Sequence, residues 1–255
     1  MKIAIRVDAS FQIGTGHFMR CLTLADTLKQ RGAEIRFICR YLPDYLQDSL
    51  RKSGYEFKLL TSVSTEVVEG DLVHSSWLGT CQHIDAQDSV HALSDSKWDW
   101  LIVDHYALDA QWESAVRAVS KKILVIDDIA DRLHDCDLLL DQNYYANMDS
   151  RYKGKVPLYC RLLLGPRYAL LRDEFRQLRE KVKLRTGPVK RILVFFGGVE
   201  GRAGEDFKNR YARFCPLGRM LREDEVTGPV DMLLSEQFSG MTGHVLAVDG
   251  GWGVW

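Results

Sequence analysis

Short apolar runs alternate with segments of helical periodicity along the first half of the chain, and this alternation limits the folds open to it. The runs are typical of strands buried on both faces of a sheet. Helical patterns lie between most of them, so the sequence predicts right-handed βαβ crossovers and an α/β fold with a Rossmann-like, doubly wound parallel sheet. The runs cover residues 3–7, 35–39, 55–60, 98–103 and 123–126, with an edge strand expected at 138–140, and the helical patterns cover 18–28, 46–52, 84–93 and 112–119.

The turn after the first run carries the residues with the clearest chemical meaning. It reads IGTGH over residues 13–17 and leads directly into the first helical pattern. His17 is therefore expected at the first helical turn, where unpaired backbone N–H groups and the helix dipole are positive. A positive helix end disfavours protonation of an imidazole, so we expect a neutral ring that accepts a proton at about pH 7. His17 is the first candidate for a general base.

Two other interpretations of this turn stay open. Gly14 and Gly16 can serve only to let the helix pack closely on the strand. The turn can also be a dinucleotide fingerprint, although Met19 stands where a third glycine is needed and the strand at 34–40 ends without an acidic residue for a ribose. Arg40 would suit the phosphate of NADP instead.

Polar side chains follow several of the predicted strands. Ligands of a doubly wound sheet bind at the carboxyl ends of its strands, so we expect these residues to lie at one edge together with His17. Each of them alone can be a helix cap or a turn residue. Asp8 would either orient the His17 ring or bind a sugar hydroxyl. The group comprises Asp8, Asp104, His105, Tyr106, Asp127, Asp128, Asp141, Gln142 and Asn143.

The composition bears on the partners and the compartment of the protein. The 255 residues carry a formal net charge of −1, which gives no sign of a nucleic-acid or membrane surface. We expect no signal peptide and no membrane span, because no apolar run is long enough to cross a bilayer. The six cysteines form no CxxC pair, which favours reduced thiols in a cytoplasmic protein. No cofactor is expected, and no ligand cluster suggests a metal.

Residues 1 to about 198 resemble the N-terminal half of the UDP-sugar hydrolases of pseudaminic acid biosynthesis. The matching motifs, in order, are RVDAS, IGTGHFMRCLTLA, WLIVDHYALD, VIDDIADRLHDCDLLLDQN, LLLGPRYALLRDEF and ILVFFGG. The resemblance implies the N-terminal half of a glycosyltransferase-B-type fold, with the active site in the cleft between two domains. It also implies hydrolysis of a UDP-linked diacetamido-trideoxy sugar to the free sugar and UDP, with inversion.

The resemblance assigns the catalytic role to His17, which activates water at the anomeric carbon. A diphosphate is already a good leaving group, so the general acid of ordinary glycoside hydrolysis becomes dispensable. A small-molecule UDP-sugar is therefore the expected partner. The substrate contacts that the resemblance implies are Arg6, Asp8, Gly14, Gly16, Asp104, His105, Tyr106, Asn143 and Arg167; the sequence also allows solvent exposure for Arg167.

Residues from about 199 to 255 resemble a different family. PLGRMLREDEV and SGMTGHVLAVDGGW are similar to the extreme C-terminus of short-chain dehydrogenase/reductases, where the tail forms the last strand and packs at a subunit interface. The cofactor turn of that family has no counterpart in this tail, and its YxxxK catalytic pair occurs nowhere in the chain. Its oxidoreductase activity is therefore not carried over.

The sequence thus predicts three segments. Residues 1–186 form the Rossmann-like domain with the candidate base, 187–198 begin a truncated nucleotide-binding domain, and 199–255 form an incomplete, foreign tail. Loss of the nucleotide-binding half is expected to impair activity. Two alternatives remain: a non-catalytic remnant that self-associates through an exposed strand at 192–196, and an NADP-dependent short-chain oxidoreductase.

Overall fold

The structure is a computed structural model of the chain, in which residues 1–60, 72–181, 212–213, 215–235 and 248 are described. The chain divides into two compact units, Met1–Lys181 and Val182–Trp255. The first unit contains the sheet and the candidate site. Helix α8 (Glu223–Leu234) belongs to the second unit and contains Pro229.

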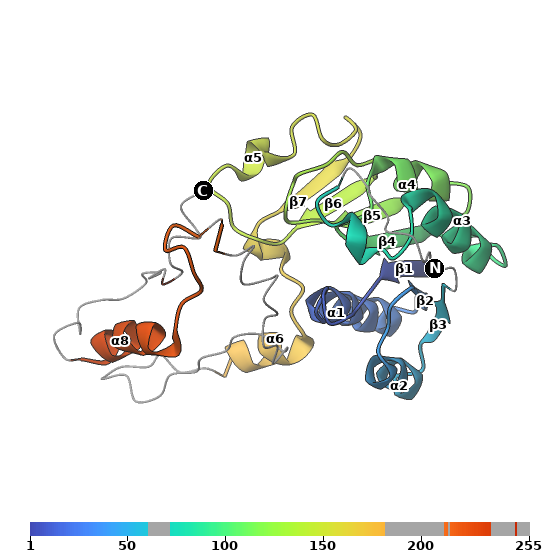
Figure 1. The fold of residues 1–255 in the computed structure, drawn as a ribbon. Coiled ribbons are helices and arrows are strands. Elements are labelled where there is room, and N and C mark those ends of the chain that lie inside the picture. The colour runs from blue at the N-terminus through green and yellow to red at the C-terminus, as the bar shows by residue number, and fades with distance from the viewer. Residues whose placement is uncertain (61–71, 182–211, 214, 236–247, 249–255) are drawn as a thin grey trace. The chain divides into compact units, whose positions relative to one another are not determined.

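Among the described residues of the first unit, seven parallel strands form one sheet (Figure 1). The order across the sheet is β3-β2-β1-β4-β5-β6-β7, so the chain moves outward from β1 in one direction and then resumes on its other side at β4. This reversal defines a doubly wound sheet, and the predicted α/β fold class is confirmed. The strands are β1 (Lys2–Val7), β2 (Glu34–Cys39), β3 (Glu56–Leu59), β4 (Trp100–Asp104), β5 (Ile123–Ile126), β6 (Leu138–Asp141) and β7 (Arg161–Leu164).

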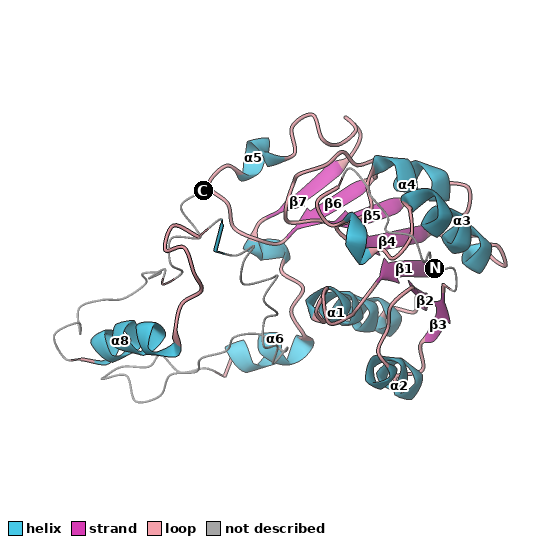
Figure 2. Ribbon diagram, viewed as in Figure 1, coloured by secondary structure: helices cyan, strands magenta, loops and turns pink. Residues whose placement is uncertain are grey.

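Helices cover both faces of the sheet, as Figure 2 shows. Alternate residues of β1 point to opposite faces: Ile3 and Ile5 join one apolar core, whereas Ala4 joins the other. Buried residues of α1 and α2 pack in the first core, and buried residues of α3 and α4 pack in the second. The helices are α1 (Gly16–Gln30), α2 (Asp44–Lys52), α3 (Gln82–Leu93), α4 (Ala110–Val116), α5 (Met148–Arg151) and α6 (Asp173–Arg179), with 3-10 turns η1 (Ser75–Trp77) and η2 (Pro166–Tyr168).

One predicted strand position is wrong. The run at 138–140 was expected at an edge, but β6 lies inside the sheet and pairs with β5 on one side and β7 on the other. The cause is the apolar run Leu162–Leu164, which supplies a further strand and covers the free edge of β6. Strand β7 is therefore the edge strand, and the chain continues from it toward the second unit.

Several predictions lie outside the described residues. They include the truncated domain start at 187–198 and the exposed strand at 192–196. The last strand that the second resemblance implies for the tail, expected at 242–249, also lies outside them apart from Val248. The division into three segments stays a prediction. In the part of the chain that the structure describes, no helix combines the length and apolar character needed to cross a membrane.

Candidate active site

The turn between β1 and α1 places His17 in the first turn of a helix. Gly14 has a φ of 75°, a conformation that glycine adopts readily and other residues rarely. Its N–H donates to the carbonyl oxygen of Ser10 at 2.8 Å, which closes the turn. A Cβ atom built on Gly14 or Gly16 would meet nothing within 4 Å, so close packing does not explain either glycine.

The His17 ring contacts Asp104 at the carboxyl end of β4. The distance between His17 Nδ1 and an Asp104 carboxylate oxygen is 2.6 Å. An ionised carboxylate only accepts, so Nδ1 carries the proton of this hydrogen bond and Nε2 is the acceptor nitrogen of the neutral ring. The Asp104 side chain is fully buried, whereas the His17 side chain is 11% exposed. This arrangement suits an imidazole that takes a proton from water at its outer nitrogen.

Arg20 lies one helical turn after His17 and binds the same carboxylate. Its Nε and Nη2 atoms donate to the two oxygens of Asp104 at 2.6 and 2.7 Å. Burial alone would raise the pKa of Asp104, but the charge that His17 carries when it is protonated and the hydrogen bond from Arg20 outweigh it and hold that pKa well below its ordinary value of 3.8. Asp104 therefore remains a carboxylate, and a proton that arrives at His17 stays on the imidazole.

Asp128 connects this group to two further residues expected at the site. Arg20 Nη1 donates to an Asp128 oxygen at 2.9 Å, and Asn143 Nδ2 donates to the same oxygen at 3.2 Å. The Tyr106 hydroxyl donates to the other oxygen of Asp128. Burial and this hydrogen bond to a carboxylate both raise the pKa of Tyr106, so its hydroxyl stays protonated. The structure thus brings four residues expected at the site, His17, Asp104, Tyr106 and Asn143, into one hydrogen-bonded cluster. With Arg20 and Asp128, which connect them, these residues are called the His17 cluster.

Aromatic rings lie beside the His17 cluster. The Tyr106 ring meets the His17 ring edge-on, with centroids 4.6 Å apart and planes at 83°. His74 and Trp77 lie on Tyr106 in turn, with centroids 5.2 and 5.9 Å from it. These rings restrict the orientation of the Tyr106 ring and, through it, that of His17.

Two expected contacts, Arg6 and Asp8, are instead part of a buried ion cluster. Both oxygens of Asp8 accept from Arg6, at 2.6 and 3.0 Å, and the backbone N–H of Arg40 donates to Asp8 at 2.6 Å. Arg6 also binds Asp85, and both the Arg6 and Asp8 side chains are 0% exposed. Asp104, not Asp8, therefore contacts the His17 ring in this structure, and neither Arg6 nor Asp8 presents surface to a substrate.

His105 belongs to the same buried ion cluster. Its Nδ1 accepts the N–H of Ala107 at 3.1 Å, and its Nε2 lies 3.3 Å from an Asp8 oxygen. Burial lowers the pKa of His105, which favours a neutral ring. Arg167 lies in η2 instead, exposed, with its guanidinium 4.7 Å from the centroid of the Tyr168 ring.

Arg40 does not have the freedom that an NADP phosphate site requires. Its guanidinium donates to Asp85 at 2.9 Å and to Asp88 at 2.9 Å, and its side chain is fully buried. These contacts hold the guanidinium inside the protein, where two carboxylates already neutralise it. The geometry therefore gives no support to the dinucleotide interpretation of the first turn.

Sequence reasoning did not single out Arg20, Asp128, His74 or Trp77. A signal for Arg20 was present, because a residue three positions after His17 lies on the same face of a helix. Asp128 was noted only as one of several polar residues after a strand. Nothing in the local pattern around His74 and Trp77 places them near Tyr106, since that contact joins segments far apart in the chain.

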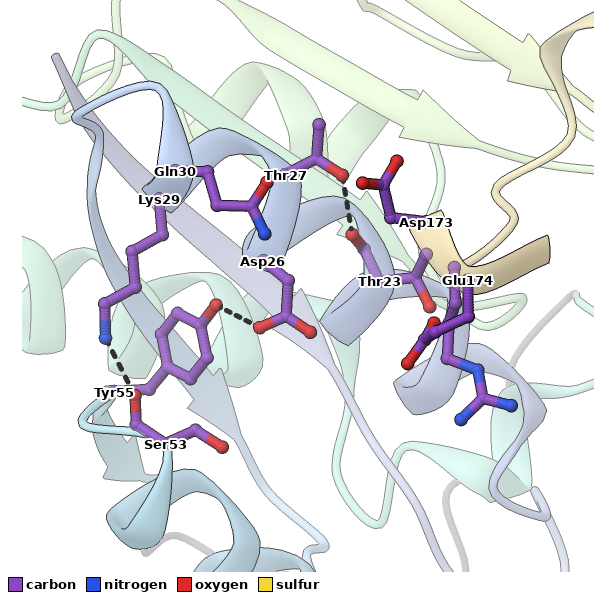
Figure 3. A pocket seen from close by; sticks show the side chains of 10 residues that line it. Thr23, Asp26, Thr27, Lys29, Gln30, Ser53, Tyr55, Asp173 and Glu174 are labelled. Atoms are coloured by element: carbon purple, nitrogen blue, oxygen red, sulfur yellow. Dashed lines mark hydrogen bonds between the residues drawn. The ribbon is translucent and has the colours of Figure 1, made fainter. Parts of the chain in front are cut away.

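A cavity of about 410 Å³ lies elsewhere in the first unit (Figure 3). Polar groups around it bond to each other or to nearby backbone: the Tyr55 hydroxyl donates to Asp26 at 2.6 Å, and Lys29 donates to the carbonyl oxygen of Ser53 at 2.8 Å. Neither His17 nor any of the substrate contacts that the resemblance implies lines it. The candidate site is therefore placed at the His17 cluster, on the chemistry of its side chains. The lining is Thr23, Asp26, Thr27, Lys29, Gln30, Ser53, Tyr55, Arg172, Asp173 and Glu174.

Comparison with curated proteins finds similarity to a hydrolase and to an uncharacterized protein. The chain is 32% identical over 178 residues to the UDP-2,4-diacetamido-2,4,6-trideoxy-beta-L-altropyranose hydrolase of Campylobacter jejuni. The matched residues cover 69% of this chain and 54% of the hydrolase. It is 24% identical over 204 residues to an uncharacterized protein of Methanocaldococcus jannaschii, covering 78% of this chain and 37% of that protein. The chain thus spans about half the length of the hydrolase and less of the archaeal protein.

A shorter similarity concerns the C-terminal region. Fifty-one residues are 47% identical to an uncharacterized short-chain type dehydrogenase/reductase of Sinorhizobium fredii, covering 20% of this chain and 9% of that protein. Both resemblances expected from the sequence are therefore confirmed as resemblances. No protein-family model matches the chain.

Solved structures show only distant similarity. MurG of Acinetobacter baumannii is 10% identical with a TM-score of 0.36, covering 64% of this chain and 44% of MurG. BdcA in complex with NADPH is 14% identical with a TM-score of 0.30, covering 95% of this chain and 90% of BdcA. Scores of this size carry no argument about fold or function.

Proposed function

We propose that this chain, similar over most of its length to a UDP-sugar hydrolase, carries the water-activating site of such an enzyme. The proposed reaction is hydrolysis of a UDP-linked diacetamido-trideoxy sugar to the free sugar and UDP. The observation that carries the proposal is the 2.6 Å contact between His17 and the buried Asp104 carboxylate. A neutral imidazole oriented in this way is the general base that the reaction needs.

The proposed mechanism uses one proton acceptor. His17 Nε2 takes a proton from water as the water oxygen attacks the anomeric carbon. The bond from that carbon to the diphosphate oxygen breaks, and its electron pair leaves with UDP. Attack from the face opposite the leaving group inverts the anomeric configuration.

Asp104 and Arg20 have positioning roles in this proposal. Asp104 accepts the Nδ1–H of His17, which selects the tautomer and stabilises the imidazolium that forms. Arg20 binds both Asp104 oxygens and keeps the carboxylate ionised, so the proton remains on His17. Tyr106 and Asn143 are proposed as sugar contacts, because both reach the cluster through Asp128.

We propose that these 255 residues by themselves hold the nucleotide half of the substrate weakly. The chain covers 54% of the hydrolase, and in the family resemblance the second domain binds UDP. Binding energy from remote parts of a substrate positions its reacting centre, so weaker contact with UDP lowers the rate of hydrolysis as well as the affinity. We therefore expect slower UDP release than from a complete two-domain hydrolase.

A UDP-release assay on the diacetamido-trideoxy UDP-sugar tests the proposal. His17→Ala is expected to lower kcat by about 100-fold or more, the usual contribution of a general base. His91→Ala, an exposed position on α3, is the matched control and should leave the rate unchanged. An unsubstituted chain that releases no UDP above the rate without enzyme contradicts hydrolase activity. A measurable rate that His17→Ala leaves intact contradicts the role of His17.

A further inference from the structure

Two cysteines lie close together at the amino ends of neighbouring strands. Cys136 precedes β6 by two residues and Cys160 directly precedes β7, and their Sγ atoms are 3.5 Å apart. Both are free thiols. A disulfide has an S–S distance of about 2.0 Å, so a small movement of the two side chains brings the sulfurs into bonding distance.

Contacts on both sides of the thiols hold the two segments together. On one side, the Tyr159 hydroxyl donates to Asp135 at 2.8 Å. On the other, the N–H of Arg161 donates to the carbonyl oxygen of Asp137 at 3.0 Å, and β6 and β7 then pair in parallel. The register pairs Leu138 with Arg161, so Cys136 and Cys160 lie on neighbouring segments, offset by one residue. These contacts keep the two segments, and with them the two sulfurs, side by side.

The two thiols differ in exposure and acidity. Cys136 is buried, whereas Cys160 is partly exposed. The hydrogen bond between the two thiols lowers the pKa of Cys160, and the same bond together with burial raises the pKa of Cys136. Since an oxidant arrives from solvent, the partly exposed Cys160 is the thiol that reacts with it, and the buried Cys136 is placed to resolve the product.

We propose that Cys136 and Cys160 are an oxidation site that forms a reversible intramolecular disulfide with hydrogen peroxide. The Cys160 thiolate attacks one peroxide oxygen, the O–O bond breaks, and the departing hydroxide takes a proton to become water. The Cys136 sulfur then attacks the resulting sulfenic acid; the S–S bond forms, the S–O bond breaks, and a second water leaves with the thiol proton. The two sulfurs lose two electrons in total, and the peroxide is reduced to two waters.

The disulfide would fasten the edge strand β7 to the rest of the sheet. It would lie at the amino ends of the strands, whereas His17 contacts Asp104 at the carboxyl end of β4. Oxidation is therefore expected to stabilise the first unit without altering the His17 cluster. This inference is independent of the proposed function.

Peptide mapping after peroxide treatment tests the site. The full chain with the exposed Cys81 replaced, Cys81→Ser, is reduced, treated with hydrogen peroxide and alkylated. The expected results are loss of two thiols per chain, a mass lower by two hydrogen atoms, and recovery of the peptides of Cys136 and Cys160 joined by a bond that dithiothreitol breaks. The unfolding temperature should rise on oxidation and return on reduction.

A matched variant and the unsubstituted chain complete the test. Cys160→Ser in the same background should abolish the loss of thiols and the rise in unfolding temperature. Peptide mapping of the unsubstituted chain after peroxide treatment gives the same test without depending on whether a variant folds. Oxidation of Cys160 to its sulfinic acid, or retention of both thiols under peroxide that oxidises Cys81, would overturn the proposal.

Discussion

The carboxylate of Asp104 contacts both His17 and Arg20 in the candidate site. One oxygen lies 2.6 Å from His17 Nδ1 and 2.7 Å from Arg20 Nη2, and the other accepts from Arg20 Nε at 2.6 Å. Arg20 Nη2 also lies 3.1 Å from His17 Nδ1, but that nitrogen cannot accept while it donates its proton to Asp104. The carboxylate thus decides which ring nitrogen remains available to water.

Replacement of this carboxylate by an amide tests the tautomer argument. In Asp104→Asn, the amide NH₂ can donate to Nδ1 and move the ring proton to Nε2, the nitrogen that must accept from water. We expect kcat for UDP release to fall by about 10²- to 10⁴-fold, in line with the effect of the equivalent change in Ser-His-Asp sites. ¹⁵N NMR of the His17 ring should show the change of tautomer independently of activity.

Asp48→Asn is the matched control for that variant. Asp48 lies on α2 with its side chain 59% exposed, so its replacement removes one carboxylate without touching the cluster. Unchanged kcat and an unchanged His17 tautomer in Asp104→Asn would contradict the positioning role.

The depressed pKa of Asp104 also predicts a dependence of stability on pH. The folded-state pKa lies below the ordinary value of 3.8, so the unfolded chain binds the proton more readily. The stabilisation is therefore fully present above that value and is lost as the pH falls below it. Urea unfolding between about pH 5 and about pH 3 should show a steeper loss of free energy of unfolding for the wild type than for Asp104→Asn. Equal slopes would show that Asp104 is not held ionised.

At the scale of elements, the turn from β1 into α1 depends on two glycines for different reasons. Gly14 has a φ of 75°, whereas Gly16 begins the helix without a positive φ. A Cβ on either residue meets no atom within 4 Å, so the two positions differ in backbone conformation and not in crowding. Substitutions at the two glycines therefore distinguish the effect of backbone strain on stability from the effect of side-chain crowding.

Alanine at these two positions should have opposite effects on stability. Gly14→Ala places a Cβ in the left-handed region and is expected to lower the free energy of unfolding by about 1–2 kcal/mol. Gly16→Ala should leave it unchanged or raise it by up to about 1 kcal/mol, because alanine favours helices. Urea unfolding of both variants measures the difference. Equal losses at the two positions would mean that packing, and not backbone conformation, requires these glycines.

At the scale of the whole molecule, the described residues of the first unit form one sheet with an apolar core on each of its faces. The unit ends at Lys181, after α6, and so includes the seven strands that the structure describes. A domain that buries its own cores folds independently of the rest of its chain. The first unit should therefore be stable without the second.

Truncation tests this independence. We expect residues 1–181 to unfold cooperatively, with a thermal midpoint close to that of the full chain. Residues 1–160 lack β7 and expose the edge of β6, so that fragment should unfold at a lower temperature or aggregate. Circular dichroism and light scattering of both fragments would measure this, and a shorter fragment as stable as the longer one would contradict the role of β7.

Local patterns in the sequence determined strands β1 to β6, helices α1 to α4 and the position of His17. Burial of strands and one face of each helix imposes periods that can be read over a few residues, which is why the parallel α/β fold was predictable. The same patterns could not place 138–140 inside the sheet, because that depends on which strand pairs next to it.

Only the tertiary structure decided which acid serves His17. Asp8 is nearer in sequence, but its oxygens are taken by Arg6 and by backbone N–H groups, while Asp104 comes to His17 from 87 positions away. The pairing of β1 with β4, in which Val7 lies opposite Asp104, brings the two segments together. Strand pairing likewise brings Cys136 beside Cys160. Contacts of this kind depend on strand order and register, and no local pattern in the chain contains either.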